Sequence, residues 1–349
     1  MPKAPPLPPF AGRHFVGIDE NGMGPRLGPL VVTSVLARAS GDGAKLATTK
    51  PRGAMAKRIG DSKRLVAFDD NVLGEAWARA LALRGGAAPS SSPSDLLRSI
   101  AHDPEAELRS LCPSHHTDMC WSDAGEALAS TDDAVAACQA DLEKLAQKGL
   151  DVLRVRVAIV CARRLNDAVY AGKSRFDVDL HTMERLTLAA RGDAGEDVLA
   201  LCGKVGGFDF YADRFGPLAG RLHVVLAEGR ARSDYQFPGL GRLAFLRDAE
   251  EGHMLVGLAS LVGKWVRDHL MRRIIRFHGP EQPDASGYHD PVTARFIDAT
   301  KLVRKRLKIE PHCFERTSIG AQQATSSALS PRGRPKKSPS ERSQRLPEL

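Results

Sequence analysis

The sequence contains little cysteine and no long uninterrupted apolar segment. Its six cysteines are scattered over 349 residues and form no Cys-x-x-Cys pair, so we do not expect a disulfide-stapled fold. No apolar run is long enough to span a bilayer, and the proline-rich segment from Met1 to Phe10 lacks the apolar block of a signal peptide. We therefore expect a cytoplasmic protein with no membrane partner, and no protein partner is evident.

One group of soft metal ligands lies close together in the sequence. Cys112, His115, His116 and Cys120 fall within nine residues, which makes a zinc site conceivable. The spacing matches no known zinc finger. The preferred interpretation is a polar surface insertion.

Basic charge is concentrated at one end of the chain. The formal net charge is +8, and residues 316–349 hold seven basic and two acidic residues, a net +5, which leaves +3 for the rest. A strongly basic tail on a mildly basic body indicates a polyanionic partner, most plausibly nucleic acid.

Hydrophobic patterning predicts an α/β protein. Strands are expected at His14–Ile18, Leu30–Leu36, Val155–Cys161, Val198–Cys202, Leu222–Leu226 and Leu243–Leu246, and helices at Asp69–Leu83, Ala134–Leu145, Val178–Ala190 and Leu255–Ile275. Interleaved strands and helices favour one mixed sheet with helices on both faces. The expected organisation is a flexible N-terminus (1–12), one domain (13–310) with an insertion at about 85–132, and a disordered tail (317–349).

Two adjacent carboxylates stand at the end of the first predicted strand. Asp19 and Glu20 are followed at once by a glycine-rich turn that includes Gly22 and Gly24. Neighbouring carboxylates repel each other unless a cation lies between them, and hard oxygen ligands suit Mg²⁺ or Mn²⁺. The glycines would let backbone N–H groups approach a phosphate closely. The alternative is a solvated acid pair that leads into an ordinary turn.

Four ordered motifs resemble those of the type 2 ribonucleases H (ribonuclease HII). They are Gly17-Ile18-Asp19-Glu20-x-Gly-x-Gly-Pro-x-x-Gly-Pro, Asp61-Ser62-Lys63-Arg64-Leu65, the helix segment from Leu258 to Asp268, and Ser286-Gly287-Tyr288. The resemblance extends from about Phe15 to about Lys308, with an insertion between. It implies a ribonuclease H-like mixed sheet flanked by helices with a C-terminal helical extension.

The resemblance also implies a function and a set of site residues. It implies an endoribonuclease, dependent on Mg²⁺ or Mn²⁺, that hydrolyses RNA in RNA–DNA hybrids or ribonucleotides embedded in DNA. Asp19, Glu20 and Glu250 would bind metal, with Glu251 and Asp248 as the alternatives to Glu250. Substrate contacts would come from Gly22, Gly24, Lys63, Ser260, Lys264 and Tyr288, the tyrosine packing against the sugar and helping to sense the 2′-OH.

This chain departs from the family pattern at two positions. Met23 stands where the family usually has an arginine, and Gly203 stands where the family has its third acid. Asp209 or Asp213 could substitute for that acid only if the local backbone differs. The loss of one ligand should weaken metal binding or misplace the second metal ion. The alternative function is therefore a catalytically impaired nucleic-acid-binding protein on the same fold.

The longest predicted helix has a polar line beside its apolar stripe. Gly257, Ser260, Lys264 and Arg267 follow one another along this line. Small residues there would allow close approach, and the two cations would face outward to contact phosphate. The alternative is a solvated basic face.

The tail contains a segment similar to an AT-hook. Pro331-Arg332-Gly333-Arg334-Pro335-Lys336-Lys337 would place Arg332 and Arg334 in the narrow minor groove of AT-rich DNA. The alternative is a generic basic tail that raises affinity for any polyanion.

Overall fold

A seven-stranded mixed β-sheet forms the centre of the structure, a computed structural model that describes residues 9–68, 70–279, 281–282 and 284–317. The strands are β1 (His14–Asn21), β2 (Leu30–Ala39), β3 (Leu150–Val160), β4 (Val198–Gly203), β5 (Val224–Ala227), β6 (Arg232–Phe237) and β7 (Gly241–Leu246). Their order is β3-β2-β1-β4-β7-β6-β5. The neighbours β1, β4 and β7 run parallel, and every other neighbouring pair is antiparallel.

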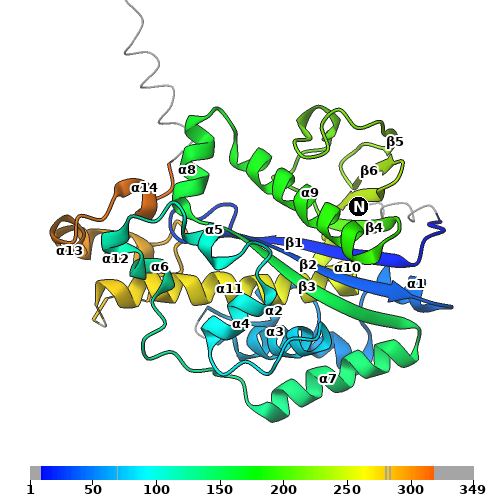
Figure 1. Ribbon diagram of the computed structural model, residues 1–349, viewed down its shortest axis with the longest axis horizontal. Helices are drawn as coiled ribbons and strands as arrows, with labels where there is room; N and C mark the ends of the chain where they lie inside the picture. Colours follow the sequence, from blue (N-terminus) through cyan, green and yellow to red (C-terminus); the bar gives the residue numbers. More distant parts are fainter. Residues whose placement is uncertain (1–8, 69, 280, 283, 318–349) are drawn as a thin grey trace, which may run out of the picture. The chain divides into compact units, whose positions relative to one another are not determined.

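Helices cover both faces of this sheet (Figure 1). On one face α9 (Arg175–Ala194) packs against β1, β2 and β4, and on the other α11 (Met254–His278) packs against the same three strands. The remaining α-helices are α1 (Gly43–Ala47), α2 (Ser62–Leu65), α3 (Val72–Arg84), α4 (Pro93–Ile100), α5 (Glu105–Arg109), α6 (Asp118–Trp121), α7 (Asp132–Gln147), α8 (Ala162–Tyr170), α10 (Ala249–Gly252), α12 (Pro291–Ala299), α13 (Lys301–Arg306) and α14 (Pro311–Phe314). This arrangement confirms the predicted α/β class and the mixed sheet.

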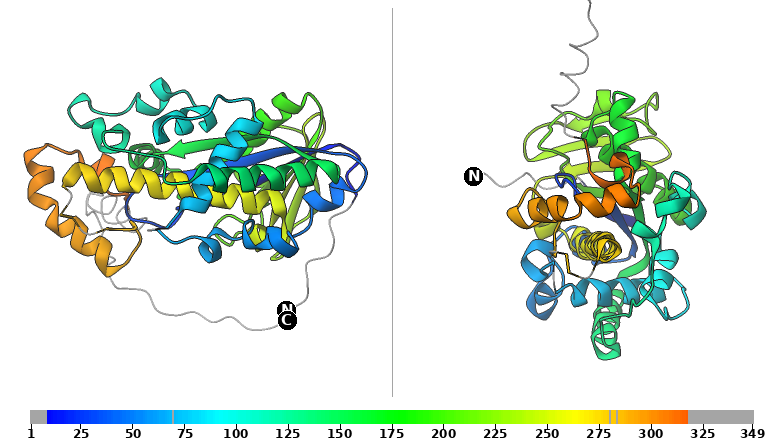
Figure 2. Two further views of the ribbon diagram at one scale, coloured as in Figure 1. Left: turned by 90° about the horizontal axis from the view of Figure 1, so that it is seen from below. Right: turned by 90° about the vertical axis from the view of Figure 1, so that its left-hand side faces the viewer.

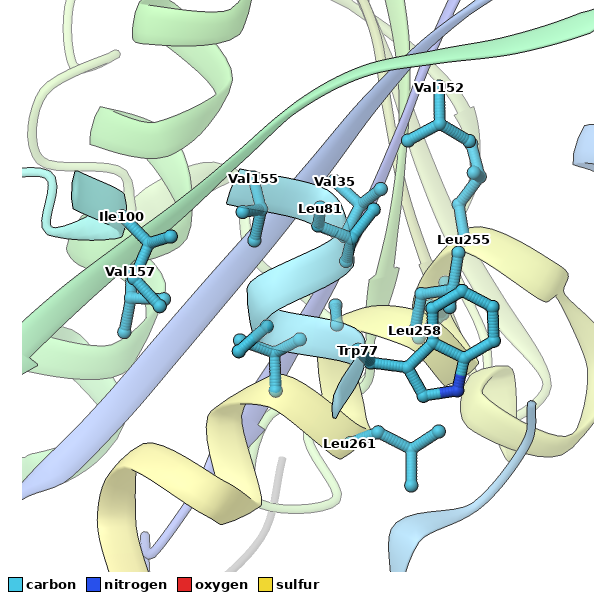
Figure 3. Packing of buried hydrophobic residues seen from close by; sticks show 14 of the residues in the cluster. Val35, Trp77, Leu81, Ile100, Val152, Val155, Val157, Leu255, Leu258 and Leu261 are labelled. Carbon is cyan, nitrogen blue, oxygen red and sulfur yellow. The ribbon is translucent and has the colours of Figure 1, made fainter. Parts of the chain in front are cut away.

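The core on the α11 face consists of side chains from the sheet, α3 and α11. Val35 of β2, Trp77 of α3 and Leu258 of α11 are all buried there (Figure 3). The indole N–H of Trp77 donates to the Arg58 carbonyl at 2.6 Å, so the polar atom of this buried ring is satisfied. Burial of large apolar side chains is the main favourable term that fixes α11 on the sheet.

Strand β1 and helix α11 approach each other closely at Gly17. A Cβ at this position would lie 2.2 Å from the carbonyl carbon of Leu255, so only glycine fits the crossing. Because successive strand residues point to opposite faces, Phe15 contributes to the core on the α11 face, while Val16 and Ile18 contribute to the core on the α9 face. Asp19 therefore points toward α11, and Glu20 toward α9.

Helix α11 differs from its prediction on the polar line. The helix is buried along most of its length, and the right-hand view of Figure 2 shows it nearly end-on with other elements around it. The prediction of an outward-facing Arg267 is wrong, because only 3% of its side chain is exposed and it donates to Asp268 and to the Ser286 carbonyl. The small residues on this line lie against other segments of the chain, Gly257 against Gly60 and Ser260 against Ser62.

The remaining differences from the sequence prediction involve short elements. Strand β6 and helix α8 were not predicted, and the segment interpreted as a featureless insertion contains α4, α5 and α6. Among the described residues, no helix combines the length and apolar character needed to cross a membrane. The chain divides after Arg316 into two units, and residues 311–316, beyond the predicted domain end, belong to the first.

Candidate active site

The carboxyl ends of the parallel strands β1 and β4 bring the predicted acid pair to one edge of the sheet. Ile18 pairs with Cys202, so Asp19 and Gly203 are neighbours one residue further along. A Cβ on Gly203 would lie 3.2 Å from Oδ1 of Asp19. An acid at position 203 would therefore stand directly beside Asp19, as the family pattern implies, and in this chain that place holds no side chain.

A polar pocket opens at this edge. It is lined by Asp19, Glu20, Asn21, Ser62, Lys63, Gly203, Lys204, Gly207, Asp209, Arg230, Arg247, Asp248, Glu250 and Ser260. Residues from β1, α2, β4, α10 and α11 thus meet in one place, although they are up to 241 positions apart in the sequence. The pocket combines carboxylates with lysine and arginine side chains, a composition suited to a cation and an anionic ligand together.

Asp19 is buried among other acids. Only 8% of the residue is exposed. Burial raises the pKa of Asp19 well above its ordinary value, and the charges of Glu20 and Glu250 raise it further, whereas a hydrogen bond with Ser260 and the charge of Lys63 lower it. The Ser260 hydroxyl is also hydrogen-bonded with the Ser62 hydroxyl at 3.0 Å, which ties α11 to α2 beside the acid.

Glu20 points to the α9 face of the sheet, where the charge of another acid, Asp179, acts on it. Burial raises the pKa of Glu20 to about 8, and the next largest cause is the charge of Asp179 on α9. Asp179 is fully buried, and neither of its carboxyl oxygens has a hydrogen-bond partner. Burial followed by the charge of Asp19 raises the pKa of Asp179 well above its ordinary value. Asp179 does not line the pocket, but it is a buried acid close enough to act on Glu20, and the sequence prediction did not include it.

The structure separates the three candidates for the acid before α11. Glu250 lines the pocket and acts electrostatically on Asp19, Glu20 and Lys63. Asp248 also lines the pocket, but 74% of its side chain is exposed and it lies 3.6 Å from Arg247. Glu251 does not join the group, because it lines a different pocket and pairs with Arg64 at 3.6 Å.

Lys63 is the cation nearest to these acids. Burial lowers the pKa of Lys63, but Glu250, Asp61, Asp19 and Glu20 outweigh this effect and raise the pKa above its ordinary value. Its backbone N–H also donates to the Asp61 carboxylate at 2.9 Å, which caps the short helix α2. Lys63 thus carries a positive charge in the lining of the acidic pocket.

The glycine-rich loop after β1 is supported by buried arginines. Gly22 has φ +94°, a conformation that favours glycine, and a Cβ there would collide with Arg267. Arg316 is 4% exposed and donates to the carbonyls of Gly22 at 2.5 Å and Gly28 at 2.9 Å. Gly24 is exposed, with no atom within 4 Å of an added Cβ. Arg316 therefore fixes the backbone of the loop through hydrogen bonds, while Gly24 faces open space.

The two other predicted substrate contacts differ in accessibility. Lys264 is 17% exposed in its side chain and pairs with Asp268 at 2.7 Å. Tyr288 is 43% exposed, and the Arg267 guanidinium lies 4.5 Å from its ring centroid. Arg267 thus holds the exposed tyrosine ring in place instead of contacting solvent itself.

The acids proposed as substitutes for the one missing at Gly203 do not fill its place. Asp209 is neutralised by Lys204, whose ammonium lies 2.6 Å from it and also donates to the carbonyls of Phe208 and Gly229. Asp213 is exposed and does not line the pocket. The local backbone therefore does not bring either acid to Asp19.

Within the described part of the chain, no three His, Cys, Asp or Glu side chains already converge as a metal site. This includes the soft-ligand group: the His115 ring is hydrogen-bonded with the Lys308 carbonyl at 3.0 Å, and Cys112 and Cys120 are free thiols. The hard oxygen donors of the acidic pocket still suit Mg²⁺ or Mn²⁺, and Asp179 offers two unpartnered oxygens. Arg332 and Arg334 of the predicted AT-hook lie outside the described residues.

Asp179 carried a signal that sequence analysis could have used. Phe176, Asp179, Met183 and Leu186 follow a helical spacing, and all four are buried on the face of α9 that meets the sheet. An acid on an apolar stripe indicates a buried carboxyl. Lys204 and Arg316 carried no comparable signal, since each depends on contacts between distant segments.

No protein-family model and no curated protein match the chain. Among solved structures, the chain is similar to the PCNA:RNase HII complex from Archaeoglobus fulgidus, with 15% identity and a TM-score of 0.38 over 88% of this chain and 98% of the other. It is similar to Bst-RNase HIII in complex with Mn²⁺, with 13% identity and a TM-score of 0.44; the match covers 92% of this chain and 71% of the other. It is also similar to ribonuclease H2 from Pyrococcus horikoshii OT3, with 13% identity and a TM-score of 0.39; the match covers 90% of this chain and 98% of the other. The solved structures similar to this chain thus include an RNase HII, an RNase HIII and a ribonuclease H2.

Proposed function

We propose that this chain is a divalent-cation-dependent endoribonuclease that hydrolyses RNA in RNA–DNA hybrids or at ribonucleotides embedded in DNA. The observation that supports this most is the gathering of Asp19, Glu20 and Glu250 at one end of the sheet, with Lys63 as the nearest cation. Like charges are costly when they are buried together, and a bound cation is the usual reason for retaining them.

The residues of the chain have distinct tasks in this proposal. Asp19, Glu20 and Glu250 would hold Mg²⁺ or Mn²⁺, which when bound supplies Lewis acidity toward the scissile phosphate and lowers the pKa of water. Lys63, Lys264 and the exposed backbone at Gly24 would bind the phosphates of the substrate strand. Gly22 gives the loop the turn that this approach needs.

Tyr288 is the residue proposed to distinguish RNA from DNA. Its ring is exposed beside the glycine loop, and the Gly287 carbonyl accepts hydrogen bonds from the N–H groups of Arg26 and Leu27. The 2′-OH is the chemical feature that separates the two nucleic acids at a given sugar. A ring fixed by Arg267 would pack against that sugar.

Cleavage of a duplex with one ribonucleotide tests the proposal. Full-length protein with Mn²⁺ or Mg²⁺ should nick a DNA duplex at its single ribonucleotide and leave the matched all-DNA duplex intact. Asp19→Asn should reduce the rate at least about 10²-fold, because it removes a buried charge that holds the cation. Glu251→Gln is the matched control, since Glu251 lies outside the pocket. Equal cleavage by the wild type and Asp19→Asn would contradict the proposal.

Gly203 favours one alternative function. The place beside Asp19 has no carboxylate, so the chain could bind the same nucleic acids with little or no cleavage. Tight binding of the ribonucleotide-containing duplex without nicking would support this alternative. The tail, through Arg332 and Arg334, is proposed to add affinity for AT-rich DNA in either case.

A further inference from the structure

We infer that Asp179 of α9 supplies the third carboxylate of the cation site, in place of the acid that Gly203 lacks. The inference rests on the proposed function in one respect, namely that a divalent cation binds at this edge of the sheet. It moves the third ligand from strand β4 to helix α9, on the other face of the sheet.

The position of Asp179 follows from the alternation along β1. Glu20 points toward the α9 face, where Asp179 is its strongest charged neighbour. The charge of Asp19 acts on Asp179, and Asp179 in turn acts on Cys202, the residue just before Gly203. The carboxyl group of Asp179 is thus next to the ends of both β1 and β4, the two strands from which the family draws its acids.

Asp179 has no other partner that accounts for its burial. It is 0% exposed, and both carboxyl oxygens lack hydrogen bonds. Glu184, five residues further along the same helix, is also 0% exposed, but it accepts hydrogen bonds from the backbone N–H groups of Gly216 and Leu218. A buried carboxyl without any donor is costly, so the contrast points to a missing positive partner at Asp179.

A bound cation would supply the missing positive partner of Asp179 better than the nearby basic side chains do. Lys63 acts on Glu20 and Asp19, and Arg267 is already bonded to Asp268 and Ser286. A divalent ion held by Glu20 and Asp179 would compensate the charge of both carboxylates. Glu20 is partly exposed at the pocket, whereas Asp179 is fully buried behind it.

Mn²⁺ binding by the full-length protein tests this assignment without relying on activity. The free Mn²⁺ signal in electron paramagnetic resonance gives the affinity of the wild type, Asp179→Asn and Glu184→Gln. Asp179→Asn should weaken Mn²⁺ binding at least tenfold and reduce the Mn²⁺-induced rise in Tm, while the metal-free Tm stays at or above that of the wild type. Glu184→Gln should lower the metal-free Tm and leave Mn²⁺ affinity within twofold. Wild-type affinity in Asp179→Asn would overturn the inference.

A compensating variant and a wild-type measurement complete the test. Gly203→Asp in the Asp179→Asn background should restore Mn²⁺ affinity to within about threefold, and failure to do so would count against a shared ligand role. If Asp179→Asn does not fold, Fe²⁺ with ascorbate and peroxide should cut the wild-type backbone near residue 179 as well as near residue 19. Cuts near residue 19 alone would overturn the inference.

The outcome is separable from that of the proposed function. Mn²⁺ binding that depends on Asp179, without cleavage of the ribonucleotide-containing duplex, would support the inference and reject the nuclease. Cleavage with Mn²⁺ affinity independent of Asp179 would reject the inference alone.

Discussion

Two buried groups of charged side chains lie toward opposite ends of α11, and their charge balance is opposite. Near the start of the helix, Asp19, Glu20, Asp179 and Glu250 face mainly one lysine, Lys63. Near its end, a single carboxylate, Glu126, is hydrogen-bonded by His269, Arg273 and Arg276. The first group has more acids than cations, and the second has more cations than acids.

The two groups therefore shift pKa values in opposite directions. Burial raises the pKa of Glu126, but its hydrogen bonds with His269 and Arg273 outweigh burial and lower the pKa below its ordinary value. At the acidic pocket, burial and like charges act together and raise the pKa of Glu20 to about 8. A group that is satisfied internally serves the fold, whereas an uncompensated one indicates a site for an external partner.

The largest expected effect is a loss of stability when Glu126 is removed from its hydrogen-bonded group with His269 and Arg273. Glu126→Ala leaves Arg273, which is 3% exposed, and His269 without their buried counter-charge. We expect the free energy of unfolding to fall by about 3–5 kcal/mol, measured by urea denaturation. Arg276→Gln is the control, because this arginine is 44% exposed and its pair should contribute less than about 1 kcal/mol. A loss below about 1 kcal/mol in Glu126→Ala would show that the group is not structural.

A smaller effect separates the two neighbouring acids before α11. Glu250→Gln should weaken Mn²⁺ binding by about tenfold, or roughly 1.4 kcal/mol, because Glu250 belongs to the acidic pocket. Glu251→Gln should leave Mn²⁺ affinity unchanged, since Glu251 is 52% exposed beside Arg64. Both affinities can be measured by calorimetric titration. The reverse pattern would move the ligand role to Glu251 and undo the comparison.

The last expected effect is a dependence of metal-free stability on pH. The pKa of Glu20 is about 8 in the folded chain, against an ordinary value of 4.5, so the folded state holds the extra proton and stability falls as pH rises through this range. The charged groups around Glu20 are Asp19, Asp179, Glu250, Lys63 and Arg267. Glu20→Gln should flatten the slope by at most about 1.4 kcal/mol per pH unit between pH 4.5 and 8.

The contribution of Glu126 to stability should depend on pH in the opposite direction, and at lower pH, than that of Glu20. Because the folded pKa of Glu126 is depressed, its contribution is present above pH 4.5 and is lost as pH falls below that value. Urea denaturation of metal-free protein across pH 3.5–8.5 separates the two windows. An unchanged slope in Glu20→Gln would show that this acid does not titrate in that range.

The fold was predictable where sequence periodicity reports burial directly. Strands β1, β2, β4 and β7 and helices α3, α7 and α11 lie where hydrophobic patterns placed them. Strand β6 was missed because Asp234 and Arg242 pair across the sheet in its interior, so polar residues occupy positions that a local pattern assigns to solvent. The short helices α4, α5 and α6 depend on tertiary contacts that no local pattern reports.

The site was predictable only on the strands and loops that carry motifs. Asp19, Gly22, Lys63, Glu250 and Ser260 come together because the parallel strands end at one edge and Gly17 lets α11 approach. The buried role of Arg267 was missed because helical spacing fixes which residues share a face but not what covers that face. Asp179 was missed for the same reason, although its place on an apolar stripe was visible.

Arg316 determines how deletion experiments on the tail must be designed. Its backbone N–H donates to the Arg26 carbonyl, and its guanidinium satisfies the carbonyls of Gly22 and Gly28. Phe314, two residues earlier, is buried in the core formed with α11 and α12. A truncation after residue 310 would therefore disturb the glycine loop itself, and lost activity would be wrongly attributed to missing DNA affinity. Only a cut after Arg316 would report on the basic tail alone.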